Sequence, residues 1–167
     1  GIIKLSAATA MGLSRGAVNI GSTGSIIAQG INSKSGKIVI GSPSANSVRI
    51  AGNIDVSAPK RSISPSGTVI VQGRRVTHTG NIYANGRSGG KIKVLSTENL
   101  KLDGSLFAKG NKNKGGSVIV MSEDSIQTSA KTVIDVSGQL KGGTAQLLAK
   151  VKNKVSGDIF ADSSAGK

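Results

Sequence analysis

One seven-residue pattern recurs six times along the chain and constrains its fold more than any other feature. It reads Gly (Thr once), any residue, Ile or Leu, any residue, Ala or Val, any residue, then a small residue, and successive copies begin 24 to 28 residues apart. Because its two apolar positions are separated by one residue, each copy is predicted to be a strand with both apolar side chains facing inward. The copies occupy residues 24–30, 52–58, 80–86, 104–110, 132–138 and 157–163.

Two further strands are predicted between successive copies. The second strand alternates in the same way and usually follows Gly or Gly-Gly, whereas the third is shorter and precedes the next copy. Predicted second strands are residues 37–40, 68–71, 91–94, 117–120 and 144–147. Predicted third strands are residues 17–20, 47–50, 75–78, 99–102 and 125–128, and the last coil is less regular around 152–156.

A period of about 25 residues is too short to bury its own apolar face, so each period must stack on its neighbours. We therefore predict an all-β fold, a right-handed parallel β-helix of about six coils of three short strands, with Ile54, Ile82 and Leu106 stacked inside. At about 4.8 Å between paired strands, the rod would be roughly 29 Å long. Corner glycines are expected to allow positive φ at the turns. A sandwich or barrel of antiparallel strands would explain the strand length but not the repeated register.

The composition limits the kind of protein further. The absence of cysteine excludes disulfides and thiolate metal sites, and no apolar run approaches the roughly 18 residues of a transmembrane helix. Because the chain starts at Gly1 without Met, we interpret residues 1–167 as a single β-helix segment, a fragment of a longer repeat protein. Its net charge of +14 would attract polyanions, although such a charge also keeps a β-rich scaffold soluble.

The three aromatic residues form the first group of candidate binding residues. Tyr83, Phe107 and Phe160 all occupy the fourth, outward position of the repeated pattern, in a column that also contains Ile27, Asp55 and Asp135. Tyr83 and Phe107 belong to adjacent coils, so their rings should lie about one strand spacing apart. Such a pair would stack on a sugar ring or a partner surface, or the rings would pack on each other or on a further segment and stabilise the sheet.

Basic residues form the second group. Stacked coils would align them into a track for a polyanionic chain, and with few aromatics a sulfated or acidic glycan is favoured over nucleic acid. The candidates are Arg74, Arg75, Arg87, Lys91, Lys93, Lys109, Lys112 and Lys114. Further basic residues occur at Lys60, Arg61, Lys150, Lys152 and Lys154.

Enzymatic activity is not predicted. Asp55 and Asp135 share a column three coils apart, roughly 14 Å by the same strand spacing, whereas paired carboxylates of glycosidases lie about 5–10 Å apart. His78, the single histidine, falls in the column of Ile50 and Leu102, where a corner or partly buried position is expected. The sequence shows no nucleophile triad, phosphate-binding loop or metal-ligand cluster, so no catalytic residue, cofactor or metal is predicted.

The coils resemble those of the filamentous haemagglutinin family of two-partner-secreted adhesins. The resemblance lies in segments such as GNIYANG (80–86), GSLFAKG (104–110), GGKIKVLS (89–96) and GGSVIVMS (115–122), and it covers about residues 16–164. It implies export through an outer-membrane transporter, folding at the bacterial cell surface, and a role in adhesion or virulence. The family's Asn-rich secretion-domain signature, of NPNL type, is not found, so the segment looks like shaft, and no site residues can be transferred.

These considerations predict the shaft of a secreted bacterial surface adhesin that mediates cell adhesion. Its expected partners are a host-cell-surface glycan or another polyanion and the outer-membrane transporter, without specific nucleic acid and without a transmembrane segment. Two alternatives stay open: a fragment of a carbohydrate-active β-helix enzyme or phage tail spike, and the stalk of a contact-dependent toxin-delivery exoprotein.

Overall fold

The computed structural model describes residues 1–5, 16–29, 35–59 and 66–164. These residues form eighteen strands, which assemble into three parallel sheets of six strands each. The predicted all-β solenoid with three strands per coil is therefore confirmed. The described residues include no helix, and hence none long and apolar enough to cross a membrane.

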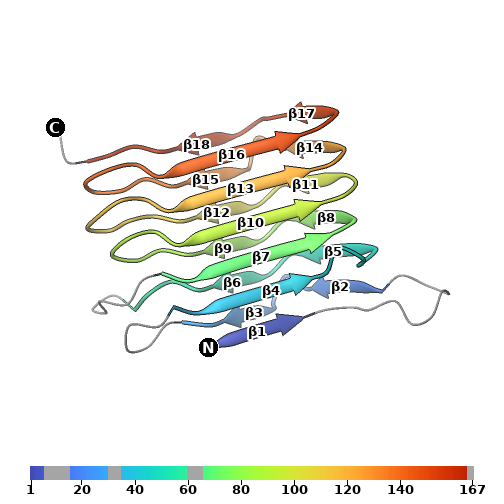
Figure 1. Cartoon of the computed structure of the whole chain (residues 1–167), viewed down its shortest axis with the longest axis horizontal. Helices are drawn as coiled ribbons and strands as arrows, with labels where there is room; N and C mark the ends of the chain where they lie inside the picture. Colours follow the sequence, from blue (N-terminus) through green and yellow to red (C-terminus); the bar gives the residue numbers. More distant parts are fainter. Residues whose placement is uncertain (6–15, 30–34, 60–65, 165–167) are drawn as a thin grey trace.

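Each coil visits the three sheets in turn, so that every third strand along the chain belongs to the same sheet (Figure 1). We number the sheets by their first strand: sheet 1 starts with β1, sheet 2 with β2 and sheet 3 with β3. Sheet 1 runs from left to right at the front of Figure 1, and the chain returns behind it through sheets 2 and 3. Because each coil lies above the preceding one, the winding is right-handed, as predicted.

Sheet 1 contains the predicted second strands, several of them extended at their carboxyl ends, and one strand that the sequence did not predict. The additional strand is β1, in which Ile3 lies opposite Ile38 of the next coil. The alternation in IIKL matches that of the following strand and is the signal that could have revealed it. The strands of sheet 1 are β1 (Ile2–Leu5), β4 (Lys37–Gly41), β7 (Thr68–Gly73), β10 (Lys91–Ser96), β13 (Ser117–Ser122) and β16 (Thr144–Ala149).

Sheets 2 and 3 contain the predicted third strands and the repeated pattern, respectively. The irregular last coil contributes β17 to sheet 2. The strands of sheet 2 are β2 (Ala17–Ile20), β5 (Ser47–Ile50), β8 (Arg75–His78), β11 (Leu100–Leu102), β14 (Ser125–Thr128) and β17 (Lys152–Lys154). The strands of sheet 3 are β3 (Ser25–Ile27), β6 (Asn53–Asp55), β9 (Asn81–Tyr83), β12 (Ser105–Phe107), β15 (Val133–Asp135) and β18 (Asp158–Phe160).

The core is a set of aliphatic ladders that run through the coils. Ile54 pairs with Ile82, Ile82 pairs with Leu106, and all three side chains are fully buried. This confirms the predicted stacking of the repeated pattern. Because parallel pairing is in register, each inward column is buried by the coils above and below it.

The corner glycines allow adjacent coils to approach closely, whereas the sequence predicted that they would adopt positive φ. Among the described residues only Gly41 and Gly157 have positive φ, so the general expectation of positive φ at the turns is wrong. At Gly116 an added Cβ would lie 2.2 Å from the carbonyl oxygen of Gly90, and at Gly143 it would lie 2.1 Å from that of Gly116. These glycines are required because the backbones of adjacent coils approach closely.

His78 is the one imidazole in this aliphatic interior. It pairs with Ile50 and Leu102, as its column predicted, but it is completely buried rather than at a corner. Its Nε2 lies 3.4 Å from the Ser105 carbonyl oxygen, and Nδ1 has no hydrogen-bond partner. Burial lowers the pKa of His78 to about 4, although the contact with Ser105 opposes the shift.

Candidate polyanion-binding surface

The solenoid has three edges, and two of them differ sharply in charge. One edge consists of the connections from sheet 3 to sheet 1, on the left of Figure 1. The opposite edge consists of the connections from sheet 1 to sheet 2, on the right. The sequence has eight carboxylate residues, and none of them falls in the sheet 3 to sheet 1 connections, which span residues 28–36, 56–67, 84–90, 108–116 and 136–143.

Five exposed basic side chains gather at this edge, and we call them the basic edge: Arg87, Lys91, Lys112, Lys114 and Lys141. Asp162 follows β18 and lies at the end of the same edge, where its backbone carbonyl accepts a hydrogen bond from Gly138. Lys114 and Lys141 form a parallel bridge between adjacent coils. The backbone N–H of Lys112 donates to the carbonyl of Arg87 at 3.1 Å, so these two residues are also on neighbouring coils. None of the ion pairs found in the described part of the chain involves a residue of the basic edge.

Four of these five residues were predicted from the sequence, and Lys141 was missed. Lys114 and Lys141 each precede a Gly-Gly pair, in NKGG and LKGG, so alignment of the two connections would have identified Lys141. Lys60 and Arg61 fall outside the residues that the structure describes.

An open groove lies at the basic edge, where three Gly-Gly pairs of successive coils are stacked. Lys91, Lys114 and Lys141 line it, together with the hydroxyl-bearing Ser117 and Thr144. Lys91, Ser117 and Thr144 are paired in register across three strands of sheet 1. The groove therefore combines three ammonium groups with hydroxyls and backbone that no side chain covers, which suits anionic, hydrogen-bonding ligands.

The other predicted basic residues are placed differently. Lys93 is exposed on the face of sheet 1, between Ile70 and Ile119 of the neighbouring strands, rather than at the edge. Lys109 points toward sheet 3, where its Nζ lies 2.9 Å from Asp135 Oδ2. Partial burial would raise the pKa of Asp135, but hydrogen bonds from Lys109 and Ser137 outweigh it and lower that pKa overall. The positive charge of Lys109 is thus compensated.

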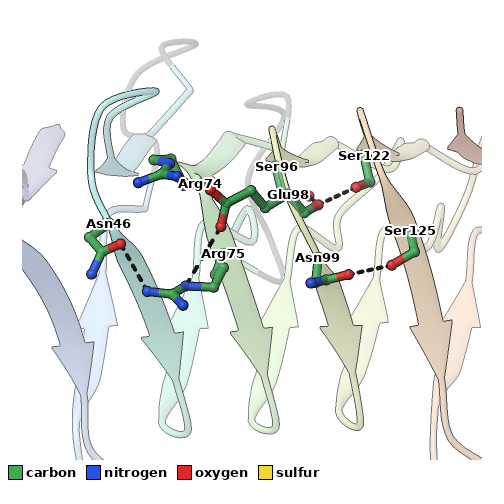
Figure 2. Close-up of polar contacts among 8 residues, drawn as sticks. All are labelled: Asn46, Arg74, Arg75, Ser96, Glu98, Asn99, Ser122 and Ser125. Atoms are coloured by element: carbon green, nitrogen blue, oxygen red, sulfur yellow. Dashed lines mark hydrogen bonds and ion pairs between the residues drawn. The ribbon is translucent and has the colours of Figure 1, made fainter. Parts of the chain in front are cut away.

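Arg74 and Arg75 lie at the opposite edge, where Glu98 of the next coil compensates both (Figure 2). Glu98 Oε1 accepts a hydrogen bond from Arg74, and Glu98 Oε2 is 3.8 Å from Arg75 Nε. Arg75 also donates to Asn46 Oδ1 at 2.9 Å. We call this group, Arg74, Arg75 and Glu98, the paired edge.

Serine side chains form hydrogen bonds within and between coils beside these ion pairs. The hydroxyl of Ser96 donates to the Glu98 carbonyl at 2.8 Å, and that of Ser122, one coil further, donates to the same oxygen. Both serines are buried. Ser125 donates to Asn99 Oδ1 at 2.5 Å (Figure 2). Side-chain hydrogen bonds therefore help to stabilise the coil stack at the paired edge.

Two of the three aromatic residues pack on each other, which is one of the predicted arrangements. The ring centroids of Tyr83 and Phe107 are 5.3 Å apart and the ring planes differ by 8°. Each ring therefore covers one face of the other. Phe160 occupies the same outward column, but Asp135 separates it from Phe107.

Comparisons of the chain with protein-family models, with curated proteins and with solved structures find no match.

Proposed function

We propose that this chain is a shaft segment of a secreted, filamentous adhesin on the bacterial cell surface, with the basic edge as its adhesive surface. The observation that carries the proposal is the row of uncompensated basic side chains along one edge of a regular solenoid. A rod of this kind repeats its surface at every coil, so weak contacts add along its length. A cell-surface glycan or another polyanion is the proposed partner.

Charge placement supports binding rather than solvation alone. If the charge served only to keep the rod soluble, basic and acidic residues could be spread over all edges alike. Instead, Glu98 compensates the paired edge, and no carboxylate falls in the five connections from sheet 3 to sheet 1 or lines the groove with three lysines. A surface of one sign attracts polyanions from a distance and concentrates them at one side of the rod.

Export through an outer-membrane transporter is part of the proposal and rests on the resemblance of the coils to two-partner-secreted adhesins. An exported rod must fold without chaperones that use ATP. Stacking of similar coils, each contacting only its neighbours, allows folding to propagate from one coil to the next.

Protease shaving of intact bacteria that carry the native protein tests this location. We expect added protease to remove the chain from intact cells while a cytoplasmic marker survives, and a deletion strain to adhere less to glycan-coated surfaces. Protection of the chain in intact cells, with digestion only after lysis, would contradict surface exposure. Unchanged adhesion of the deletion strain would contradict the adhesive role.

A further inference from the structure

We infer that the groove between Lys91, Lys114 and Lys141 binds an acidic polysaccharide that carries about one anionic group on each sugar ring. The chain would run parallel to the rod axis, across successive coils. This inference rests on the proposed adhesive role of the basic edge and assigns that role to one groove and one class of ligand.

The first argument is the arrangement of charge. The three lysines come from three successive coils. Lys114 and Lys141 lie opposite each other, about one strand spacing of 4.8 Å apart, whereas Lys91 is offset along its coil, in register with Ser117. One sugar ring of an extended polysaccharide advances its chain by a similar step. A ligand with one anionic group per ring can therefore place two successive groups against Lys114 and Lys141, and a neighbouring group against Lys91 on the preceding coil. No carboxylate lines the groove, so none repels such a ligand.

The second argument is the lining between the lysines. Of the stacked glycines, Gly89, Gly116 and Gly143 are partly exposed, so backbone is accessible between the lysines. Ser117 and Thr144 add hydroxyl groups. Hydroxyls that both donate and accept hydrogen bonds match the hydroxyl groups of a sugar. The groove therefore offers polar contacts to the rings as well as charge to the anionic groups.

Nucleic acid fits the groove less well. Single-stranded nucleic acid is held largely by stacking of its bases on aromatic side chains, each stacking contact contributing about 1–3 kcal/mol. The groove lining contains no aromatic residue. The only paired rings, Tyr83 and Phe107, belong to sheet 3 and cover each other. The lining thus favours a polysaccharide.

A second groove nearby provides a contrast. It is lined by residues that include Lys109, Gln139 and Asp162. Lys109 is compensated by Asp135 at 2.9 Å, and Asp162 adds a negative charge of its own. An anionic ligand is therefore expected in the groove with three lysines and not in this one.

The test compares three variants of the chain in binding titrations over a range of salt concentrations. The groove variant is K91Q/K114Q/K141Q, and the edge variant is R87Q/K112Q. A matched control, K101Q/K131Q/K150Q, removes an equal number of positive charges outside the groove. Of these lysines, Lys101 is ion-paired to Asp103 and Lys150 to Glu123. The probes are a polygalacturonate oligomer, a heparin-derived oligosaccharide and a thymidine oligonucleotide of equal charge. Circular dichroism verifies that each variant folds.

We expect the groove variant to bind polysaccharide about tenfold more weakly, or weaker still. The salt dependence of its affinity should correspond to about three fewer counterions released on binding. The control should change binding by less than about threefold, because exposed and paired lysines contribute only through long-range attraction. Tighter binding of polygalacturonate shows that uronate suffices, whereas tighter binding of heparin, which carries both uronate and sulfate, shows that sulfate strengthens binding. Either result supports the inference.

Other results would overturn it. Equal weakening by the groove variant and the control would show that net charge alone drives binding, and the inference would fail. Stronger binding of the oligonucleotide than of both polysaccharides would also refute it. Loss of binding in the edge variant alone would refute the groove but leave the proposed adhesive edge intact. If the native chain bound no polysaccharide, both the inference and the adhesive role would fail.

Discussion

The basic edge and the paired edge are built from the same coils, yet they hold the coils together in different ways. At the paired edge, Glu98 lies between two arginines and its carbonyl accepts hydrogen bonds from two buried serines. At the basic edge, adjacent backbones approach closely through glycines, and the lysines are exposed. The side chains of the basic edge make none of the ion pairs found among the described residues, so they are available to the ligand that we propose.

The close approach of adjacent coil backbones at the basic edge predicts the largest change in stability among the variants proposed here. Gly116→Ala should lower the free energy of unfolding by about 3 kcal/mol, because its Cβ would meet the Gly90 carbonyl oxygen at 2.2 Å and force the coils apart. Urea denaturation measures this change as a lower midpoint. Gly21→Ala is the control, since an added Cβ there has no heavy atom within 4 Å. Equal midpoints for the two variants would show that the glycines are not required.

Acidification should weaken the core around His78. Since the pKa of His78 is about 4 in the folded chain and about 6.5 when unfolded, the unfolded chain binds an additional proton between these values. The free energy of unfolding should therefore decrease as the pH is lowered. His78 should contribute a loss of about 2 kcal/mol between pH 6.5 and pH 5.

His78→Leu tests the origin of this pH dependence. Leucine matches the paired Ile50 and Leu102 and leaves no buried nitrogen without a partner. The variant should be more stable than the native chain at pH 7, by about 1 kcal/mol, and should lose less stability at pH 5. An unchanged pH dependence would assign it to other groups.

The hydrogen bonds of the paired edge predict a smaller effect. Ser122→Ala removes the hydroxyl that donates to the Glu98 carbonyl and should reduce stability by about 1 kcal/mol. Its effect should be clearly smaller than that of Gly116→Ala in the same denaturation experiment. A larger effect of Ser122→Ala would reverse our assignment of backbone contact and side-chain bonding to the two edges.

Glu98→Gln should convert the paired edge into a second basic surface. Because the Glu98 side chain is 32% exposed, losing its ion pairs should cost less than about 1 kcal/mol of stability. Arg74 and Arg75 would then be uncompensated, and heparin should bind about two- to threefold more tightly, as measured by titration at low salt. Unchanged affinity would mean that compensation by Glu98 does not distinguish the two edges.

Much of the fold was predictable because the signals were local. Alternation and glycine-rich corners predicted the strands, and in-register repetition predicted that Ile82 stacks between Ile54 and Leu106. The role of the corner glycines was not predictable in this way, because it depends on how closely adjacent coils approach. The complete burial of His78 likewise depends on the coils above and below it.

The candidate site was predictable only in part. The sequence identified most of the basic residues, but it did not show which of them share an edge or which are compensated. Arg74 is paired with Glu98, 24 residues away, and Lys109 with Asp135, in the third strand after it along the chain. Such pairs form only when coils stack, so a linear pattern of charges does not distinguish Lys109 from Lys114.

The account depends on coils that stack at a constant rise, and pulsed electron paramagnetic resonance measures that rise directly. The chain has no cysteine, so spin labels can be attached to pairs of introduced cysteines without first replacing native ones. Ser25, Asn53 and Asp158 belong to one outward column, in which Ser25 and Asp158 are five coils apart and Asn53 and Asp158 are four. We predict separations of about 24 Å and about 19 Å for these pairs, a difference of one strand spacing. If the separation between Asn53 and Asp158 were not shorter than that between Ser25 and Asp158 by about one strand spacing, the result would contradict the stacked solenoid.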